Sequence, residues 1–252
     1  MKINSRSKVL MRTYNKFNGG TMSETVKLIE HVVTWQGECI DSGRRMLLLR
    51  FKNCDRVINK KPCPWCDTLI KMRVSAEAPY QLKDIQKSIY DNFAGLMISG
   101  GEPLYNDNFD DTTRLLTNLK YPISNIETNG CNIDKFLDQS DHYKYGGKVR
   151  VIYSPKVFVK EDFDIEIERI EKAMEYSFFK NVYFKIVVDG SQITRLLIEN
   201  ICQRFNLNEK VYLMPQGKNR EELIKNAPIV FDLADEFNTN ISSREHLIYD
   251  FI

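Results

Sequence analysis

Short apolar runs alternate with longer helix-like stretches along most of this 252-residue chain. The runs are rich in β-branched and aromatic residues and cover residues 26–33, 46–51, 95–99, 123–127, 149–153, 183–188 and 211–214. The helix-like stretches cover residues 82–93, 110–119, 164–176, 192–205, 219–226 and 228–237. Because parallel strands need long crossover connections, usually helices, this alternation predicts an α/β fold with a parallel sheet.

Chain length and the absence of repeats restrict the fold further. Residues 23–252 are enough for one large core and contain no internal repeat or low-complexity tract. We therefore predict a single-domain, incomplete TIM-like barrel of about six parallel strands joined by crossover helices. Residues 242–252 are predicted to add one more strand.

The charges nearly balance, with 36 Lys and Arg against 34 Asp and Glu and a net charge of +2. No global field favours a nucleic-acid partner, and we expect no direct binding to nucleic acid. Residues 1–22 contain five basic residues and no acidic one, which predicts a flexible basic N-terminal arm. No stretch reaches the roughly 20 apolar residues of a membrane span, and no secretory signal is evident, so a cytoplasmic protein without membrane contact is expected.

Three of the six cysteines are grouped after the second strand-like run: Cys54, Cys63 and Cys66. Three thiolates hold three corners of a four-iron cluster and leave the fourth iron open to a small molecule, whereas a structural zinc site takes four protein ligands. Lys60 and Lys61 in the loop would lower the thiol pKa. A zinc site that recruits Cys39 is the alternative. The three remaining cysteines, Cys39, Cys131 and Cys202, are predicted to be spare.

Polar motifs follow the next strand-like runs at the point where each run ends. They are Ser99-Gly-Gly-Glu-Pro103, Glu127-Thr-Asn-Gly130 and Ser154-Pro-Lys156. Carboxyl ends of parallel strands meet at one face of an α/β fold, so these motifs and the cysteines should converge there. Gly100 and Gly101 let the backbone approach a ligand closely, although a simple tight turn would explain them too.

In this order the motifs resemble the radical S-adenosylmethionine (SAM) superfamily, and within it the 7-carboxy-7-deazaguanine synthases. The resemblance also includes Trp35-Gln-Gly-Glu38, Leu49-Arg-Phe51, Cys63-Pro-Trp-Cys66-Asp-Thr68 and Met214-Pro-Gln-Gly217. It implies a lyase that converts 6-carboxy-5,6,7,8-tetrahydropterin to 7-carboxy-7-deazaguanine with loss of ammonia, on the route to queuosine and other deazapurines. The reaction would start with hydrogen abstraction by a 5′-deoxyadenosyl radical and would need Mg²⁺.

The resemblance also implies roles for individual residues. A [4Fe–4S] cluster would be bound by Cys54, Cys63 and Cys66, and Mg²⁺ by Thr68, with Asp67 nearby. The implied substrate contacts are Trp35, Gln36, Gly37, Arg50, Ser99, Pro215 and Gln216. The implied SAM contacts are Gly100, Gly101, Glu102, Glu127, Asn129, Ser154 and Lys156. No catalytic side chain is expected beyond the radical generated from cluster-bound SAM, and Lys185 and Asp189 stay outside this set.

Each of these roles has a structural alternative. Asp67 and Thr68 would serve equally as a helix cap, Arg50 as a surface ion pair, and Asn129 as part of a turn. The three histidines are expected to be packing or surface residues. The expected partners are a flavodoxin- or ferredoxin-type electron donor and a second copy of the chain in a homodimer. A radical SAM activase or peptide-modifying enzyme and a zinc-stabilised non-catalytic binding protein remain the alternative functions.

The chain departs from the family pattern at two places. Eight residues separate Cys54 from Cys63, where the family usually has three. A longer loop costs little entropy, roughly 1 kcal/mol or less, and the added residues are expected to form a basic lid or a new contact surface. Cys39 stands where the family generally has glycine, and Ser99 where threonine is common; Cys39 is expected to be an inert small side chain.

Overall fold

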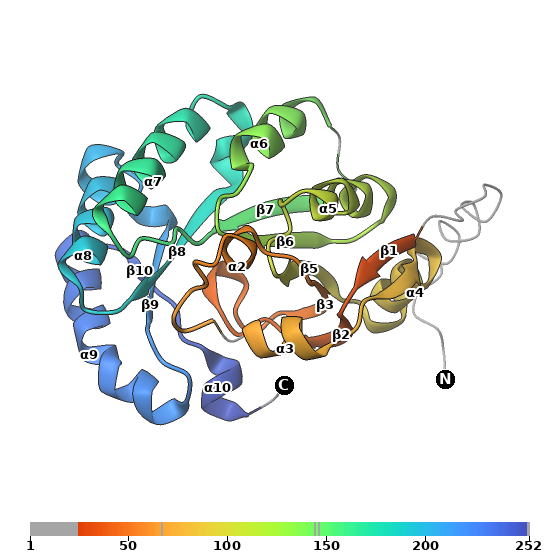
Figure 1. The fold of residues 1–252 in the computed structure, drawn as a ribbon, viewed down its shortest axis with the longest axis horizontal. Coiled ribbons are helices and arrows are strands. Elements are labelled where there is room, and N and C mark those ends of the chain that lie inside the picture. The colour runs from red at the N-terminus through yellow and green to blue at the C-terminus, as the bar shows by residue number, and fades with distance from the viewer. Residues whose placement is uncertain (1–24, 67, 144, 146, 251–252) are drawn as a thin grey trace, which may run out of the picture.

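A computed structural model describes residues 25–66, 68–143, 145 and 147–250 of the chain. An eight-stranded sheet forms its centre, in the order β10-β9-β8-β7-β6-β5-β3-β2 (Figure 1). Every neighbouring pair is parallel except β2 and β3, which are antiparallel. The strands are β2 Glu30–Trp35, β3 Arg45–Phe51, β5 Gly95–Gly100, β6 Ile123–Thr128, β7 Lys148–Tyr153, β8 Val182–Val188, β9 Val211–Pro215 and β10 Asn240–Ile241. The α/β fold with a mostly parallel sheet is therefore confirmed.

Crossover helices connect the parallel strands. They are α4 Leu82–Asn92, α5 Asp107–Asn118, α6 Ile133–His142, α7 Lys160–Ala173, α8 Gln192–Glu199 and α9 Arg220–Phe237. Figure 1 shows them along the outer side of the curved sheet. Shorter segments are α2 Asp55–Ile58, α3 Leu69–Val74, α10 Glu245–Tyr249, the 3₁₀ turns η1 Cys39–Asp41, η2 Ser177–Asn181 and η4 Asn208–Lys210, and the π-helical turn η3 Asn200–Arg204. No helix of the described residues is both long and apolar enough to span a membrane.

The two faces of the sheet are packed differently. On β3, Leu47 and Leu49 belong to the large core between the sheet and the outer helices, where they are buried. Met46 and Leu48 point to the other face and form a small separate cluster with Met97 and Ile123. An apolar run buried on both faces is typical of a central parallel strand. The small cluster leaves the rest of the inner face to polar side chains.

Three predictions of the bounds or type of a strand or helix are wrong. Residues 26–33 are two strands: β1 Thr25–Leu28 pairs with β4 Ala78–Gln81 in a separate two-stranded sheet, and β2 joins the main sheet. Residues 219–226 and 228–237 belong to one helix, α9, because the exposed Pro228 removes a backbone donor without ending the helix. The predicted strand at residues 242–252 is wrong: this segment contains the helix α10, Glu245–Tyr249.

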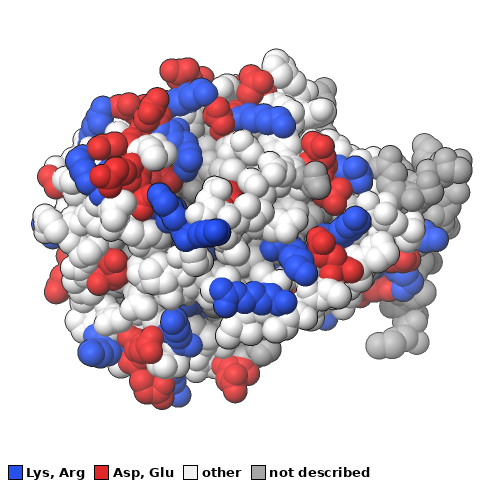
Figure 2. Space-filling model, viewed as in Figure 1, with Lys and Arg blue, Asp and Glu red and all other residues white. Residues whose placement is uncertain are grey.

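One crossover helix, α6, was not predicted from the sequence. Its buried residues Ile133, Phe136, Leu137 and Ser140 recur at the spacing of one helix face, so the signal was present. The predicted basic arm, residues 1–22, lies outside the described residues. On the face drawn in Figure 2, basic and acidic side chains are interspersed, in line with the near-balance of charges in the sequence.

Candidate active site

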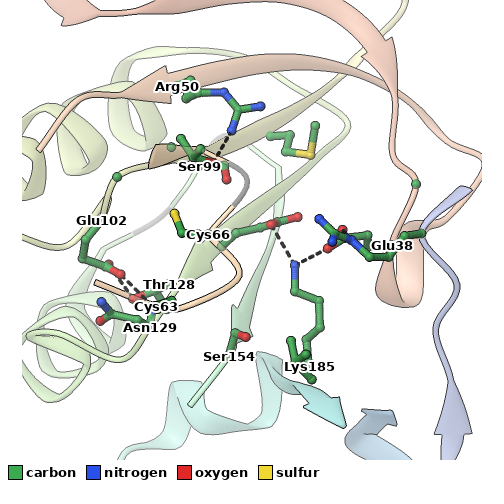
Figure 3. A pocket seen from close by; sticks show the side chains of 18 of the residues that line it. Glu38, Arg50, Cys63, Cys66, Ser99, Glu102, Thr128, Asn129, Ser154 and Lys185 are labelled. Atoms are coloured by element: carbon green, nitrogen blue, oxygen red, sulfur yellow. Dashed lines mark hydrogen bonds and ion pairs between the residues drawn. The ribbon is translucent and has the colours of Figure 1, made fainter. Parts of the chain in front are cut away.

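A cavity of about 220 Å³ opens on the inner face at the carboxyl ends of the parallel strands. Leu48 and Met97, from the small inner cluster, form part of its wall. The polar wall comes from successive strand ends, with Arg50 on β3, Ser99 on β5, Glu127 on β6 and Ser154 just after β7 (Figure 3). The predicted convergence of the strand-end motifs at one face is thus found in the structure.

The grouped cysteines Cys54, Cys63 and Cys66 all line this cavity, and all three are half-buried free thiols. The described residues contain no group of three Cys, His, Asp or Glu side chains that could hold one metal ion. In an iron–sulfur cluster each thiolate binds a different iron, so three thiols that line one cavity are suitable donors for it. Burial, opposed by backbone hydrogen bonds, raises the pKa of Cys54 to about 12, so binding iron would displace a proton there.

The other cysteines lie off the cavity wall. Cys39 is buried, and its backbone N–H donates to Ser242 Oγ at 2.7 Å. Its φ of 61° is in the left-handed region, which favours glycine. Burial raises the pKa of Cys39, and likewise of Cys131, to about 12, and that of Cys202 to about 11.

The Ser99-Gly-Gly-Glu segment lies directly against the residues that lead to Cys54. Gly101 N donates to Phe51 O at 2.8 Å and Glu102 N to Asn53 O at 2.7 Å. Gly100 has a φ of +114°, and a Cβ on Gly101 would overlap the Asn53 carbonyl. The two glycines are therefore required for this close approach, which sets the motif beside the first cluster cysteine.

Glu102 connects the ends of β5 and β6 from a fully buried position (Figure 3). Its carboxylate accepts hydrogen bonds from Thr128 Oγ1 at 2.6 Å, Asn129 N at 2.6 Å and Leu104 N at 3.0 Å. Burial raises the pKa of Glu102 to about 7, although these hydrogen bonds oppose the rise. Glu102 lines the cavity, and the three hydrogen bonds to its carboxylate position neighbouring backbone and side chains.

We expect this carboxyl to make stability depend on pH. A carboxyl whose pKa is raised on folding contributes stability that is complete below pH 4.5 and is lost as the pH rises through about 7. The unfolding free energy of the wild type relative to Glu102→Gln should thus fall by about 2 kcal/mol between pH 5 and pH 8. Urea unfolding at both pH values measures it, with Glu168→Gln, an exposed carboxylate on α7, as control. Parallel pH curves for wild type and Glu102→Gln would contradict the assignment.

A buried ion network forms the opposite wall of the cavity. Lys185 Nζ on β8 lies 2.6 Å from Glu38 Oε2 and 2.9 Å from Glu127 Oε2 (Figure 3). Gln36 Nε2 donates to Glu127 Oε1 at 2.9 Å, and Arg244 Nε lies 3.0 Å from Glu38 Oε1. Burial alone would raise the pKa of Glu38, but the two cations outweigh it and hold that pKa well below the usual value. The network joins the segment after β2, the strands β6 and β8, and the residue before α10.

The sequence predicts Gln36 and Glu127 of this network as site residues, but Lys185 and Arg244 are not among the predicted ones. A lysine inside the otherwise apolar strand Val182–Val188 was the available signal. His246 was predicted to be a packing or surface residue, yet it lines the cavity, with Nε2 3.9 Å from Glu38 Oε1. A Cβ on Gly37 would lie 2.7 Å from His246 Nδ1, so glycine permits this approach of α10.

Arg50 occupies the wall nearest α3. Its Nε lies 2.6 Å from Glu30 Oε2, and its Nη1 donates to Thr68 Oγ1 at 3.0 Å. Lys71 Nζ pairs with Glu30 Oε1 at 2.5 Å. Burial would raise the pKa of Glu30, but the hydrogen bonds from Lys71 and Arg50 lower it below its usual value. The ion pair with Glu30 fixes the Arg50 guanidinium in the cavity wall. Thr68 directly precedes α3, and its side chain makes no capping hydrogen bond to that helix.

The remaining predicted contacts are distributed unevenly. The cavity is lined by Gln36, Gly37, Gly100, Asn129 and Lys156. Trp35 lines it too, and 50% of this residue is exposed to solvent. Lys156 Nζ donates to Ser154 Oγ at 2.5 Å, and burial lowers the pKa of Lys156.

Three predicted positions do not line the cavity or cannot be described. Pro215 and Gln216 are absent from the cavity wall, which their neighbours Met214 and Gly217 line instead. Asp67 lies outside the described residues. The individual ligand roles assigned to all of these residues from the sequence stay predictions.

Comparison with known proteins gives one consistent result. No family model matches the chain. Curated proteins named 7-carboxy-7-deazaguanine synthase are similar: that of Clostridium acetobutylicum is 27% identical over 197 residues, 75% of this chain and 80% of that protein. Those of Aquifex aeolicus (24% identical, 85% of this chain and 89% of that protein) and Methanothermobacter thermautotrophicus (25%, 83% and 89%) are similar too.

A solved structure, described as the crystal structure of QueE from Escherichia coli, has the same fold. It superposes with a TM-score of 0.54 at 18% identity and covers 88% of this chain and 95% of that one. The resemblance predicted from the ordered motifs is thereby confirmed.

Proposed function

We propose that this chain, a relative of the 7-carboxy-7-deazaguanine synthases, is a radical SAM lyase of the queuosine pathway. Its reaction would convert 6-carboxy-5,6,7,8-tetrahydropterin to 7-carboxy-7-deazaguanine with loss of ammonia. One observation carries the proposal: the three grouped cysteines and the polar motifs of four strand ends line a single cavity. The similarity to the curated synthases supports the substrate.

The cysteines and the strand-end motifs provide the cofactor side of the cavity. In this proposal Cys54, Cys63 and Cys66 hold the [4Fe–4S] cluster, and the SAM-binding set is that predicted from the motifs. When bound, the cluster and SAM would supply one-electron cleavage of SAM and abstraction of hydrogen from the substrate. The protein would orient the reactants and shield them from solvent. The ammonium of Lys156 interacts electrostatically with Cys63 and would offset the negative charge of thiolates on this wall.

Arg50 and Thr68 provide for the substrate. Arg50 is suited to bidentate capture of a carboxylate, and the Thr68 hydroxyl is an oxygen donor of the kind that Mg²⁺ accepts. Because Arg50 Nη1 and Thr68 Oγ1 are 3.0 Å apart, one substrate carboxylate would reach both the guanidinium and a metal ion held by Thr68. Glu30 and Lys71 keep the guanidinium in place before substrate arrives.

We expect Arg50→Lys to raise the KM for the pterin about 10- to 100-fold, because a lysine cannot reproduce the two parallel hydrogen bonds to a carboxylate. Steady-state formation of the deazapurine at varied pterin concentration measures the effect. Arg45→Lys is the matched control, since Arg45 lies on the same strand but pairs with Asn92 at the protein surface. An unchanged KM in Arg50→Lys would remove this residue from the substrate site.

The cavity also favours this function over modification of a peptide. The side chains of Gln36, Arg50 and Thr68 all line this one cavity, and such a set suits a compact heterocycle better than a polypeptide chain. The open, curved sheet supports the finer description of an incomplete TIM-like barrel. A flavodoxin- or ferredoxin-type electron donor, a homodimer and a cytoplasmic location complete the proposal.

A further inference from the structure

The enlarged loop between Cys54 and Cys63 contacts the segment after β7 through the side chain of Arg56. The guanidinium carbon lies 4.9 Å from the centre of the Phe158 ring, over its face. Arg56 Nη2 lies 3.9 Å from Asp162 Oδ2 in the first turn of α7, and the Arg56 side chain is only 15% exposed. A shielded cation over an aromatic ring contributes more than an exposed one.

The same guanidinium also binds two backbone carbonyls. Arg56 Nε donates to Lys61 O at 3.2 Å, and Nη1 donates to Lys156 O at 3.4 Å. The first bond closes the loop on itself just before Cys63. The second bond joins the loop to a residue that belongs to the predicted SAM-binding set. One side chain thus connects the cysteine loop with the segment that follows β7.

Phe158 contacts the other end of the loop as well. Trp65, which stands between Cys63 and Cys66, packs edge-on against Phe158 with 5.1 Å between ring centres and an angle of 75°. Phe158 N donates to Asp162 Oδ2 at 3.1 Å, which anchors the ring to α7. The ring therefore lies between a residue near the first cysteine and a residue near the last two.

These contacts are needed because the loop has little order of its own. Its helix, α2, has only four residues, far fewer than a helix needs to be stable alone. On its other side the loop is held by Asn129 Nδ2, which donates to Asp55 Oδ1 at 2.7 Å. Neither Arg56 nor Phe158 lines the cavity.

We propose that Arg56 and Phe158 form a clamp that positions the enlarged loop, so that Cys54 lines the same cavity as Cys63 and Cys66. Both are positioning residues, since they act through the loop and through Lys156. The inference rests on the proposed function only in taking the three cysteines as cluster ligands. The clamp itself is a property of the protein without cluster or SAM and can be tested there.

Hydrogen exchange of the full-length apoprotein tests the clamp directly. In Arg56→Gln and in Phe158→Leu, the amides of residues 55–61 and 156–159 should exchange about five- to tenfold faster than in the wild type. Arg56→Lys keeps a cation over the ring and should restore part of the protection. Arg195→Gln is the matched control. It removes an arginine that also stacks on an aromatic ring, Phe237, and pairs with a carboxylate, Glu236, but both partners are distant in sequence from the cysteine loop. Wild-type exchange in both clamp variants would overturn the proposal.

Iron retention then links the clamp to the cluster. After anaerobic reconstitution, the two clamp variants should lose iron to a chelator about three- to tenfold faster than wild type and Arg195→Gln. Equal rates of loss would show that the clamp does not position the cysteines. A wild type that holds no iron would instead contradict the proposed function, and the exchange measurement would still decide whether the clamp exists.

Discussion

Replacing Lys185 by methionine is expected to lower the free energy of unfolding by about 3 kcal/mol. The ammonium pairs with Glu38 and Glu127, and all three side chains lie in the wall of the cavity with little exposure. Removal of one partner from a buried ion pair leaves an uncompensated charge and typically costs about 3–5 kcal/mol. Arg244 and Gln36 still contact the two carboxylates, which favours the lower end of that range.

Urea unfolding of Lys185→Met measures this cost. The matched control is Lys87→Met, which removes the same kind of side chain from an ion pair with Asp91 on the exposed face of α4 and should change stability by less than about 1 kcal/mol. Adding Glu127→Gln to Lys185→Met should recover part of the loss, because it removes the buried carboxylate charge that Lys185 neutralises in the wild type. Equal effects of Lys185→Met and Lys87→Met would show that the network contributes no more than a surface pair.

The second large effect is expected for the cysteines. The iron content should fall from about four atoms per chain to a small residual amount in each of the variants Cys54→Ala, Cys63→Ala and Cys66→Ala. The reason is that three thiolates are the minimum for a cluster with one open iron. Iron and sulfide analysis after anaerobic reconstitution measures the loss. Cys131→Ala is the control: Cys131 is half-buried, like the three, but does not line the cavity.

Cys54→Ala is the most informative of the three variants, because Cys54 is separated from Cys63 by the enlarged loop. Full iron content in Cys54→Ala would mean that another residue supplies the third ligand. Tightly bound zinc in place of iron would favour the alternative of a zinc-stabilised protein.

The sequence predicted those parts of the fold and site that depend on local patterns. Apolar runs of strand length gave the parallel sheet, since a buried parallel strand such as β3 is apolar on both faces. Motifs such as Ser99-Gly-Gly-Glu-Pro103 directly follow their strands, so their meeting at one edge follows from the topology. The cavity wall formed by Arg50, Ser99, Glu127 and Ser154 was therefore accessible from the sequence.

The rest depends on contacts between residues far apart in the chain. Arg244 and His246 reach Glu38 because the C-terminal segment turns into a helix against the start of the site, where an additional strand was predicted. A separation of 206 residues between Glu38 and Arg244 leaves no local pattern that reveals the pair. The left-handed conformation of Cys39 is likewise set by its tertiary surroundings, since cysteine has no preference for it.

Turnover by the anaerobically reconstituted protein tests the central claim most directly. With 6-carboxy-5,6,7,8-tetrahydropterin, SAM, Mg²⁺ and a strong reductant, we predict formation of both 7-carboxy-7-deazaguanine and 5′-deoxyadenosine, and neither product without reductant. Formation of 5′-deoxyadenosine without the deazapurine would retain the cluster and reject the substrate. A colourless, iron-free protein that forms neither product would contradict the account as a whole.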